Sequence, residues 1–275
     1  MNPIKIDDIS APEMDLFARA TENELRTYEG TGLFIAESAY VALRALEAGY
    51  EPVAMLTETD RAEAEALPVF NALGKGLQDT VPVYMADREL IENITGHKLV
   101  RGLWTVFRRK PEPDTIDFLK DKKRIAVLVD VVNAANVGAI IRSAAALGLD
   151  GVLLTHPSVD PYTRRVLRVS MGTVFQIPCA KASWEESQSN ALMDLIKSNG
   201  FKTVSLALTE DSIPGVSSEI RSQERLALIL GTEGTGLPKQ VIEASDYRIR
   251  FPMQRGVDSL NVACAASISF WELMK

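Results

Sequence analysis

Short apolar runs alternate with helix-length segments along the second half of the chain, and this alternation limits the possible folds more than any other feature. We expect strands over 125–129, 151–155, 174–177, 203–208, 226–230 and 247–249, and helices over 137–147, 162–169, 184–197 and 261–273. Strands and helices in alternation predict an α/β fold, with a mostly parallel sheet covered on both faces. Ligands bind such sheets at the carboxyl ends of the strands.

The first half of the chain predicts a smaller α/β unit of its own. Expected strands cover 33–36, 52–56, 82–85 and 102–107, and expected helices cover 38–46, 59–73 and 87–94, with Ser38 as an N-cap. The segment Pro111-Glu112-Pro113-Asp114 interrupts both patterns, as proline-rich linkers do. The predicted organisation is therefore a domain over 1–110, a linker over 111–121 and a second domain over 122–275.

Composition favours an ordinary folded protein in a reducing compartment. The chain has 275 residues, of which 46% are hydrophobic, enough for one large or two moderate domains. Its two cysteines, Cys179 and Cys264, lie in apolar runs without a CxxC pair, which predicts reduced thiols and a cytoplasmic location. There is neither a signal-peptide pattern nor an apolar run of membrane-spanning length. With two histidines, a histidine-based metal site is not expected, and we predict no metal.

The charge pattern predicts a local rather than a general affinity for nucleic acid. A net charge of −7 argues against indiscriminate binding to phosphates. Basic residues nevertheless gather in the middle of the chain. We predict RNA contacts for Arg108, Arg109 and Lys110, and for Arg164, Arg165 and Arg168. A solvated basic surface is the alternative for either group.

Polar residues and glycines follow three of the expected strands. The segments are 133–142, 231–237, and 251–253 with 259–262. Little charge and much free backbone predict a neutral or cationic small molecule held by main-chain groups. Simpler alternatives remain open from these residues alone. Asn136, Ser259 and Asn261 could be helix caps, Arg142 could pair with a structural carboxylate, and the glycines around Glu233 could form a plain turn.

The three segments together resemble the motifs of the SpoU branch of the SPOUT RNA methyltransferases, also called the TrmH family. The first motif is Asn136-Val137-Gly138-Ala139-Ile140-Ile141-Arg142-Ser143-Ala144, and the second is Gly231-Thr232-Glu233-Gly234-Thr235-Gly236-Leu237. The third comprises Phe251-Pro252-Met253 and Ser259-Leu260-Asn261-Val262. Thr232 replaces a usual asparagine, and Phe251 replaces a usual aliphatic residue. The segment 34–50 resembles the N-terminal substrate-binding domain of many SpoU enzymes, but Lys98-Leu99-Val100-Arg101-Gly102 replaces their His-Gln-Gly-like segment.

This resemblance implies a trefoil-knotted, parallel-sheet methyltransferase domain after a smaller α/β RNA-binding domain. The implied activity is methyl transfer from S-adenosylmethionine to a ribose 2′-hydroxyl of structured RNA, either rRNA or tRNA, by a homodimer. It implies catalytic or substrate-orienting roles for Asn136, Arg142, Glu233, Ser259 and Asn261. It implies cofactor contacts at Leu208, Gly231, Phe251 and Leu260.

Two other classes compete with this interpretation. A non-catalytic RNA-binding or ribosome-assembly protein could retain the same fold, although Arg142, Glu233 and Asn261 are all present. A dinucleotide-dependent enzyme is disfavoured because no GxGxxG motif opens an early strand–helix unit.

Overall fold

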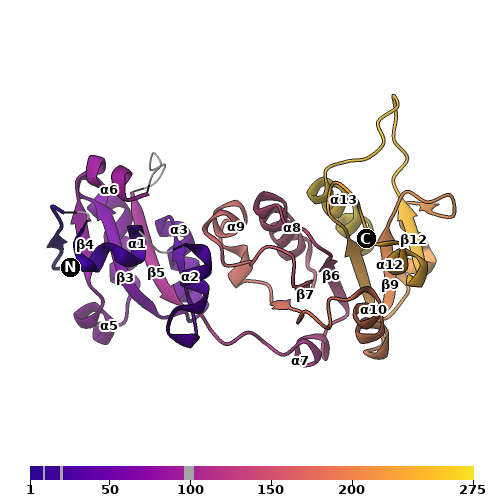
Figure 1. Ribbon diagram of the computed structural model, residues 1–275, viewed down its shortest axis with the longest axis horizontal. Helices are drawn as coiled ribbons and strands as arrows, with labels where there is room; N and C mark the ends of the chain where they lie inside the picture. The colour runs from indigo at the N-terminus through magenta and orange to yellow at the C-terminus, as the bar shows by residue number, and fades with distance from the viewer. Residues whose placement is uncertain (9, 19–20, 96–101) are drawn as a thin grey trace. The chain divides into compact units, whose positions relative to one another are not determined.

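The computed structural model of the protein describes residues 1–8, 10–18, 21–95 and 102–275. Lys98 and Arg101, in the segment that replaces the family's His-Gln-Gly-like residues, lie outside the described residues. The chain divides into two compact units (Figure 1). The first comprises Met1–Pro111 together with Tyr162–Phe175, and the second comprises Glu112–Pro161 together with Gln176–Lys275.

The first unit is built on a mixed sheet of five strands in the order β1-β4-β3-β5-β2. The strands are β1 (Ile4–Lys5), β2 (Leu33–Ala36), β3 (Pro52–Glu58), β4 (Val83–Ala86) and β5 (Leu103–Arg108). Strand β3 runs parallel to β4 and antiparallel to β5. The four strands expected in this half are confirmed, and β1 is an additional edge strand that is too short to leave a pattern.

Helices of the first unit are mostly short. They are α1 (Asp15–Ala18), α2 (Glu22–Thr27), α3 (Ala39–Glu47), α4 (Leu67–Ala72), α5 (Lys75–Thr80) and α6 (Arg88–Thr95). The N-cap predicted for α3 is confirmed, since Ser38 Oγ accepts a hydrogen bond from the Val41 N–H at 3.3 Å. The continuous helix expected over 59–73 is wrong. A 3₁₀ turn over Thr59–Arg61 and a π turn over Ala62–Ala66 precede α4 there.

Residues Tyr162–Phe175, which we call the excursion, lie between strands of the second unit in sequence but belong to the first. They contain α9 (Arg164–Val169) and a 3₁₀ turn over Thr173–Phe175. The rings of Tyr162 and Phe175 lie 5.5 Å and 5.4 Å from that of Phe34, and the Tyr162 hydroxyl is 2.8 Å from the Tyr50 hydroxyl. Aromatic packing therefore joins the excursion to β2. The strand expected over 174–177 is wrong, because Val174 and Ile177 are buried by packing without entering a sheet.

The second unit contains a sheet of seven strands, in the order β10-β12-β9-β11-β6-β7-β8, with every neighbouring pair parallel. The strands are β6 (Arg124–Leu128), β7 (Gly151–Leu154), β8 (Cys179–Lys181), β9 (Lys202–Leu206), β10 (Ile213–Pro214), β11 (Leu226–Leu230) and β12 (Tyr247–Arg250). The prediction of a parallel sheet is confirmed. The trefoil knot that the resemblance implies stays a prediction.

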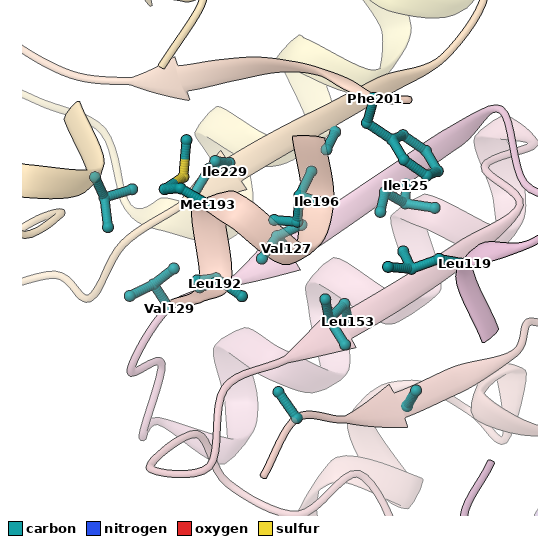
Figure 2. Packing of buried hydrophobic residues seen from close by; sticks show 14 of the residues in the cluster. Leu119, Ile125, Val127, Val129, Leu153, Leu192, Met193, Ile196, Phe201 and Ile229 are labelled. Carbon is teal, nitrogen blue, oxygen red and sulfur yellow. The ribbon is translucent and has the colours of Figure 1, made fainter. Parts of the chain in front are cut away.

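Helices cover both faces of this sheet. They are α7 (Thr115–Leu119), α8 (Ala134–Leu147), α10 (Ser189–Ser198), α11 (Ser218–Arg221), α12 (Lys239–Ala244) and α13 (Val262–Met274). Residues that alternate along the strands, such as Ile125 and Val127, pack against Leu192 and Ile196 of α10 (Figure 2). Helices α8 and α13 contact each other, and α8 also contacts β7. All five residues of β11 are buried, as expected for a strand covered on both sides.

The segment expected as a linker, 111–121, is partly helical. Helix α7 begins after Asp114, whose carboxylate accepts hydrogen bonds from the N–H groups of Ile116 and Asp117 at 2.9 and 3.3 Å. Phe118 and Leu119 are buried in the core of the second unit. Residues 112–121 therefore belong to the second unit, where Phe118 and Leu119 are part of the core.

Candidate active site

A pocket of about 580 Å³ lies at the carboxyl ends of three adjacent strands, β12, β9 and β11. Its walls come from the segments that follow these strands and from the start of α13. Leu208, Gly231, Phe251 and Leu260, the predicted cofactor residues, all line it, and so do Glu233, Ser259 and Asn261. The pocket thus lies at the sheet edge where ligands of parallel α/β proteins bind, and its size is typical of small-molecule sites.

The loop after β11 is held in a compact turn by its own backbone. The Gly236 N–H donates to the Thr232 carbonyl at 3.0 Å, and Gly236 has a φ of 68°, which favours glycine. A Cβ atom at Gly231 would lie 2.5 Å from the carbonyl carbon of Gly236, so no side chain fits there. At Gly234, by contrast, nothing lies within 4 Å of the corresponding position. The turn presents the exposed Glu233 side chain at the pocket.

Two asparagines from different motifs meet beside the pocket. The Asn261 Nδ2 donates to the Asn136 Oδ1 at 3.0 Å. Asn261 also caps α13, because its Oδ1 accepts from the N–H groups of Ala263 and Cys264 at 2.9 and 3.4 Å. Capping occupies the oxygen and leaves the amide nitrogen to donate, so one side chain serves both purposes. The capping alternative for Asn136 is wrong, since Asn133 caps α8 and Asn136 lies in its first turn.

Arg142 lies apart from this pair. It is exposed on α8, six residues after Asn136 and therefore roughly 120° away around the helix. It is not among the pocket-lining residues. Within the part of the chain that the structure describes, no hydrogen bond or ion pair engages its guanidinium. The alternative of a structural carboxylate partner thus finds no support, and one chain by itself does not bring Arg142 to its own pocket.

Five of the six basic residues predicted to bind RNA make contacts within the first unit. Arg109 is 6% exposed, and its Nε donates to the Leu33 carbonyl at 3.1 Å. Arg108, Arg164 and Arg168 pair with Glu29, Glu22 and Glu37 at 3.1, 2.8 and 3.0 Å, and the Lys110 Nζ donates to the Ala48 carbonyl at 2.6 Å. Arg165 is exposed. The five side chains other than Arg165 are thus engaged by groups of the protein itself. RNA binding stays a prediction for all six.

Two residues of this edge were not anticipated from the sequence. Asp130, between β6 and α8, has a φ of 55°. Its N–H donates to the Thr155 Oγ1, which donates in turn to the Asp130 Oδ1, both at 2.9 Å. Aspartate adopts a positive φ more readily than most residues, and the bonds to Thr155 hold Asp130 in this conformation. Arg250 lines the pocket at the end of β12, directly before Phe251.

Comparison with known proteins connects this geometry to a family. The sequence model of the SpoU rRNA methylase family matches residues 123–271, which contain all the pocket-lining segments. An uncharacterised tRNA/rRNA methyltransferase of Mycobacterium tuberculosis is 35% identical over 270 residues, covering 96% of this chain and 89% of that protein. The chain belongs to the SpoU rRNA methylase family.

Other relatives of this SpoU protein extend the comparison. The 23S rRNA guanosine 2′-O-methyltransferase RlmP of Bacillus subtilis is 34% identical over 197 residues, covering 72% of this chain and 74% of RlmP. The crystal structure of an AdoMet-bound rRNA methyltransferase from Sinorhizobium meliloti has a TM-score of 0.80 at 22% identity, covering 98% of this chain and 97% of that one. An RNA 2′-O ribose methyltransferase superposes with a TM-score of 0.77 at 24% identity, covering 98% of both chains. These two structures confirm the fold.

Proposed function

We propose that this SpoU protein transfers a methyl group from S-adenosylmethionine to a ribose 2′-hydroxyl of structured RNA, either rRNA or tRNA. The observation that carries the proposal is the meeting of the motifs. The second and third motifs line one pocket, and Asn261 of the third bonds Asn136 of the first. A relative named as a 23S rRNA 2′-O-methyltransferase, 34% identical over 72% of this chain, supports the ribose hydroxyl as acceptor.

The pocket fits the cofactor by its chemistry. Gly231, Phe251 and Leu260 line the pocket, and in this proposal their main-chain groups meet the donors and acceptors of adenine and ribose. The missing Cβ of Gly231 lets the following turn close against it, and this fixes the shape of the wall. Glu233 and Arg250 are the charged residues among those that line the pocket, and charges of both signs suit a ligand that carries an ammonium, a sulfonium and a carboxylate. When bound, S-adenosylmethionine supplies an activated methyl group.

The remaining residues have the task of presenting a weak nucleophile. A ribose hydroxyl must be aligned with the methyl carbon and must lose its proton, and alignment alone can supply several kcal/mol. In our proposal Arg142 binds the adjacent phosphate and positions the hydroxyl, since a guanidinium donates in a planar fork but is not deprotonated. Asn136, Glu233, Ser259 and Asn261 complete the substrate-orienting shell.

We propose that the protein is a homodimer, because a dimer accounts for the distance of Arg142 from the pocket of its own chain. Arg142 is exposed and does not line the pocket of its own chain, so a second copy could bring its Arg142 to that pocket. The exposed apolar residues Ile268, Trp271 and Met274 on α13 give a face for such a contact, being 40%, 57% and 42% exposed. Each RNA site would then contain residues of both subunits.

The smaller unit is proposed to bind RNA, with the exposed Arg165 as the side chain most available to phosphates. No helix among the described residues is long and apolar enough to cross a membrane. Unpaired thiols at Cys179 and Cys264, together with an RNA substrate, support a cytoplasmic location.

Two measurements test the proposed function. Titration calorimetry should show one S-adenosylmethionine site per chain. Mapping of ribose methylation in total RNA, from cells with and without the gene, should reveal a site that depends on the protein. Cofactor binding without any gene-dependent methylated ribose would favour the non-catalytic RNA-binding alternative. Binding of NAD without any response to S-adenosylmethionine would contradict both.

A further inference from the structure

Two exposed rings lie against each other beyond the ends of β7 and β8. Trp184 is 57% exposed, and its ring centroid lies 5.6 Å from that of the exposed His156, at an interplanar angle of 89°. An exposed tryptophan is unusual, because a ring of this size normally contributes to a core or an interface. None of the roles assigned above uses this pair.

The pair lies on the same sheet edge as the pocket. Leu230, Leu128, Leu154 and Lys181 form one row across β11, β6, β7 and β8, and His156 and Trp184 follow Leu154 and Lys181 in the chain. Three strand spacings separate β11 from β8, which amounts to roughly 14 Å. The first motif follows β6, between the two. An RNA strand whose ribose lies at the pocket could therefore place a nearby nucleotide at the rings.

Hydrogen bonds hold the turn that carries Trp184. The Ser183 N–H donates to the Glu186 carboxylate at 2.8 Å, and the Glu186 N–H donates back to Ser183 Oγ at 3.2 Å. The Ser187 hydroxyl donates to the Ser183 carbonyl at 2.6 Å and accepts from the His156 N–H at 2.7 Å. Ser187 thus ties the two ring-bearing segments together. A turn held in this way loses little conformational entropy when a ligand packs on the ring that it carries.

We propose that Trp184, supported by His156, stacks an unpaired base of the RNA substrate. Unpaired bases stack on aromatic side chains, and stacking depends little on sequence because every base has a π-face. The exposed carboxylate of the neighbouring Glu185 makes the turn a poor phosphate site. Stacking of a base fits that charge better than backbone contact does. This proposal rests on the proposed function, since it takes RNA as the substrate.

Steady-state kinetics separates a stacking ring from a structural one. In Trp184→Ala, the KM for RNA should rise by about tenfold, within the range for losing one base–aromatic stack. The kcat and the S-adenosylmethionine affinity should stay close to the wild-type values. Trp184→Phe keeps a π-face and should recover most of the loss. An unchanged KM in Trp184→Ala, or equal losses in the Ala and Phe variants, would overturn the proposal.

A binding measurement tests the same point without turnover. The chain has three tryptophans, and Trp184→Phe leaves Trp104 and Trp271 in place, so the difference between wild type and this variant isolates the fluorescence of Trp184. Addition of a short oligoadenylate should quench the fluorescence of the wild type, and Trp184→Phe should abolish that change. Absence of quenching would overturn the proposal. A shift from dimer to monomer in Trp184→Ala would also overturn it, because it would show that the rings belong to a protein interface. If the wild type methylates no RNA but quenching occurs, the proposed function fails while this site stands.

Discussion

The two edges of the seven-stranded sheet differ in how their charged groups are used. At the carboxyl edge, the exposed carboxylate of Glu233 engages no partner among the described residues. At the amino edge, charged side chains are occupied by backbone groups. The Asp150 carboxylate accepts from the N–H groups of Lys123 and Arg124, each at 2.7 Å. The Arg225 guanidinium donates to the Lys122 and Asn199 carbonyls at 2.9 and 2.7 Å and lies 4.2 Å from the Phe201 ring.

This difference indicates that the amino edge of the sheet serves stability and the carboxyl edge serves ligand binding. Paired charges at the amino edge hold the loops that enter the strands, whereas Glu233 at the carboxyl edge and Arg142 on α8 remain available for ligands. Substitutions at the amino edge should therefore change the free energy of unfolding, and substitutions at the carboxyl edge should change binding or turnover.

Arg142→Ala should reduce methyl transfer at saturating RNA by about a hundredfold or more, because misalignment of a weak nucleophile has effects of that size. Arg142→Lys should also lose much activity, since an ammonium cannot reproduce the planar fork. Calorimetry should show nearly wild-type cofactor affinity, and thermal unfolding should be unchanged. A folded Arg142→Ala protein with wild-type turnover would show that the residue is not part of the mechanism.

Arg225→Ala should lower the free energy of unfolding by about 2 kcal/mol, because it leaves several carbonyls without a charged donor. That loss is a factor of about thirty in the folded-to-unfolded ratio. Denaturant unfolding measures it, and Arg165→Ala is a matched control, being an exposed arginine. For Arg225→Ala, the turnover per folded molecule should stay at the wild-type level. A loss of turnover without a loss of stability would break the proposed separation of the edges.

Gly231→Ala should weaken S-adenosylmethionine binding by about tenfold or more, because its Cβ would displace the turn that forms the pocket wall, and small misplacements have large effects. Gly234→Ala, in the same loop, meets no atom within 4 Å and should bind nearly as the wild type does. Calorimetry on the two variants compares them directly. Equal losses in both would show that loop flexibility, rather than close packing at Gly231, governs affinity.

Asp246, at the start of β12, should make a small acid-dependent contribution to stability. Burial raises the pKa of this carboxyl, but hydrogen bonds from Thr203 and Lys202 outweigh burial and hold the pKa below the ordinary value of 3.8. The stabilisation is therefore present above 3.8 and is lost as the pH falls through the lower folded-state pKa. Asp246→Asn should cost about 1 kcal/mol near neutral pH and less in acid. A difference that is constant with pH would contradict this account.

The two thiols should differ in reactivity without any change in stability. Burial raises the pKa of the Cys179 thiol, at the amino end of β8, to about 12. Cys264 is exposed in the first turn of α13, beside the pocket. A disulfide reagent near neutral pH should modify Cys264 first, because the thiolate is the nucleophile. Protection of Cys264 at high protein concentration would support a dimer through α13, and a rate that does not change with concentration would argue against it.

Much of the second unit could be predicted from the sequence because local patterns and final contacts agree there. Helices α8 and α13 have side-chain caps in Asn133 and Asn261, and both bury apolar residues such as Ile140 and Phe270. The motif segments follow strands that are parallel, so their meeting at one edge was predictable. The contact between Asn136 and Asn261 was not predictable, since it depends on how two helices distant in sequence pack.

The failures share a physical cause. The run 174–177 is apolar because Phe175 packs on Phe34, and periodicity cannot distinguish that burial from burial in a sheet. Helix α10 begins at Ser189 rather than at residue 184, because the hydrogen bonds between Ser183 and Glu186 close a separate turn first. The basic residues were predicted from charge alone, and charge does not show that Arg109 is buried under Tyr162.

The excursion has a consequence for modularity. The chain passes between its two units three times, at 111–112, 161–162 and 175–176. A protein shortened to begin at residue 112 would keep all seven parallel strands but would leave Tyr162 and Phe175 without their aromatic neighbours. It would also leave Arg164 and Arg168 without Glu22 and Glu37. The N-terminal unit therefore cannot be removed without exposing the excursion. Exchange of this unit between enzymes would require exchange of the excursion as well.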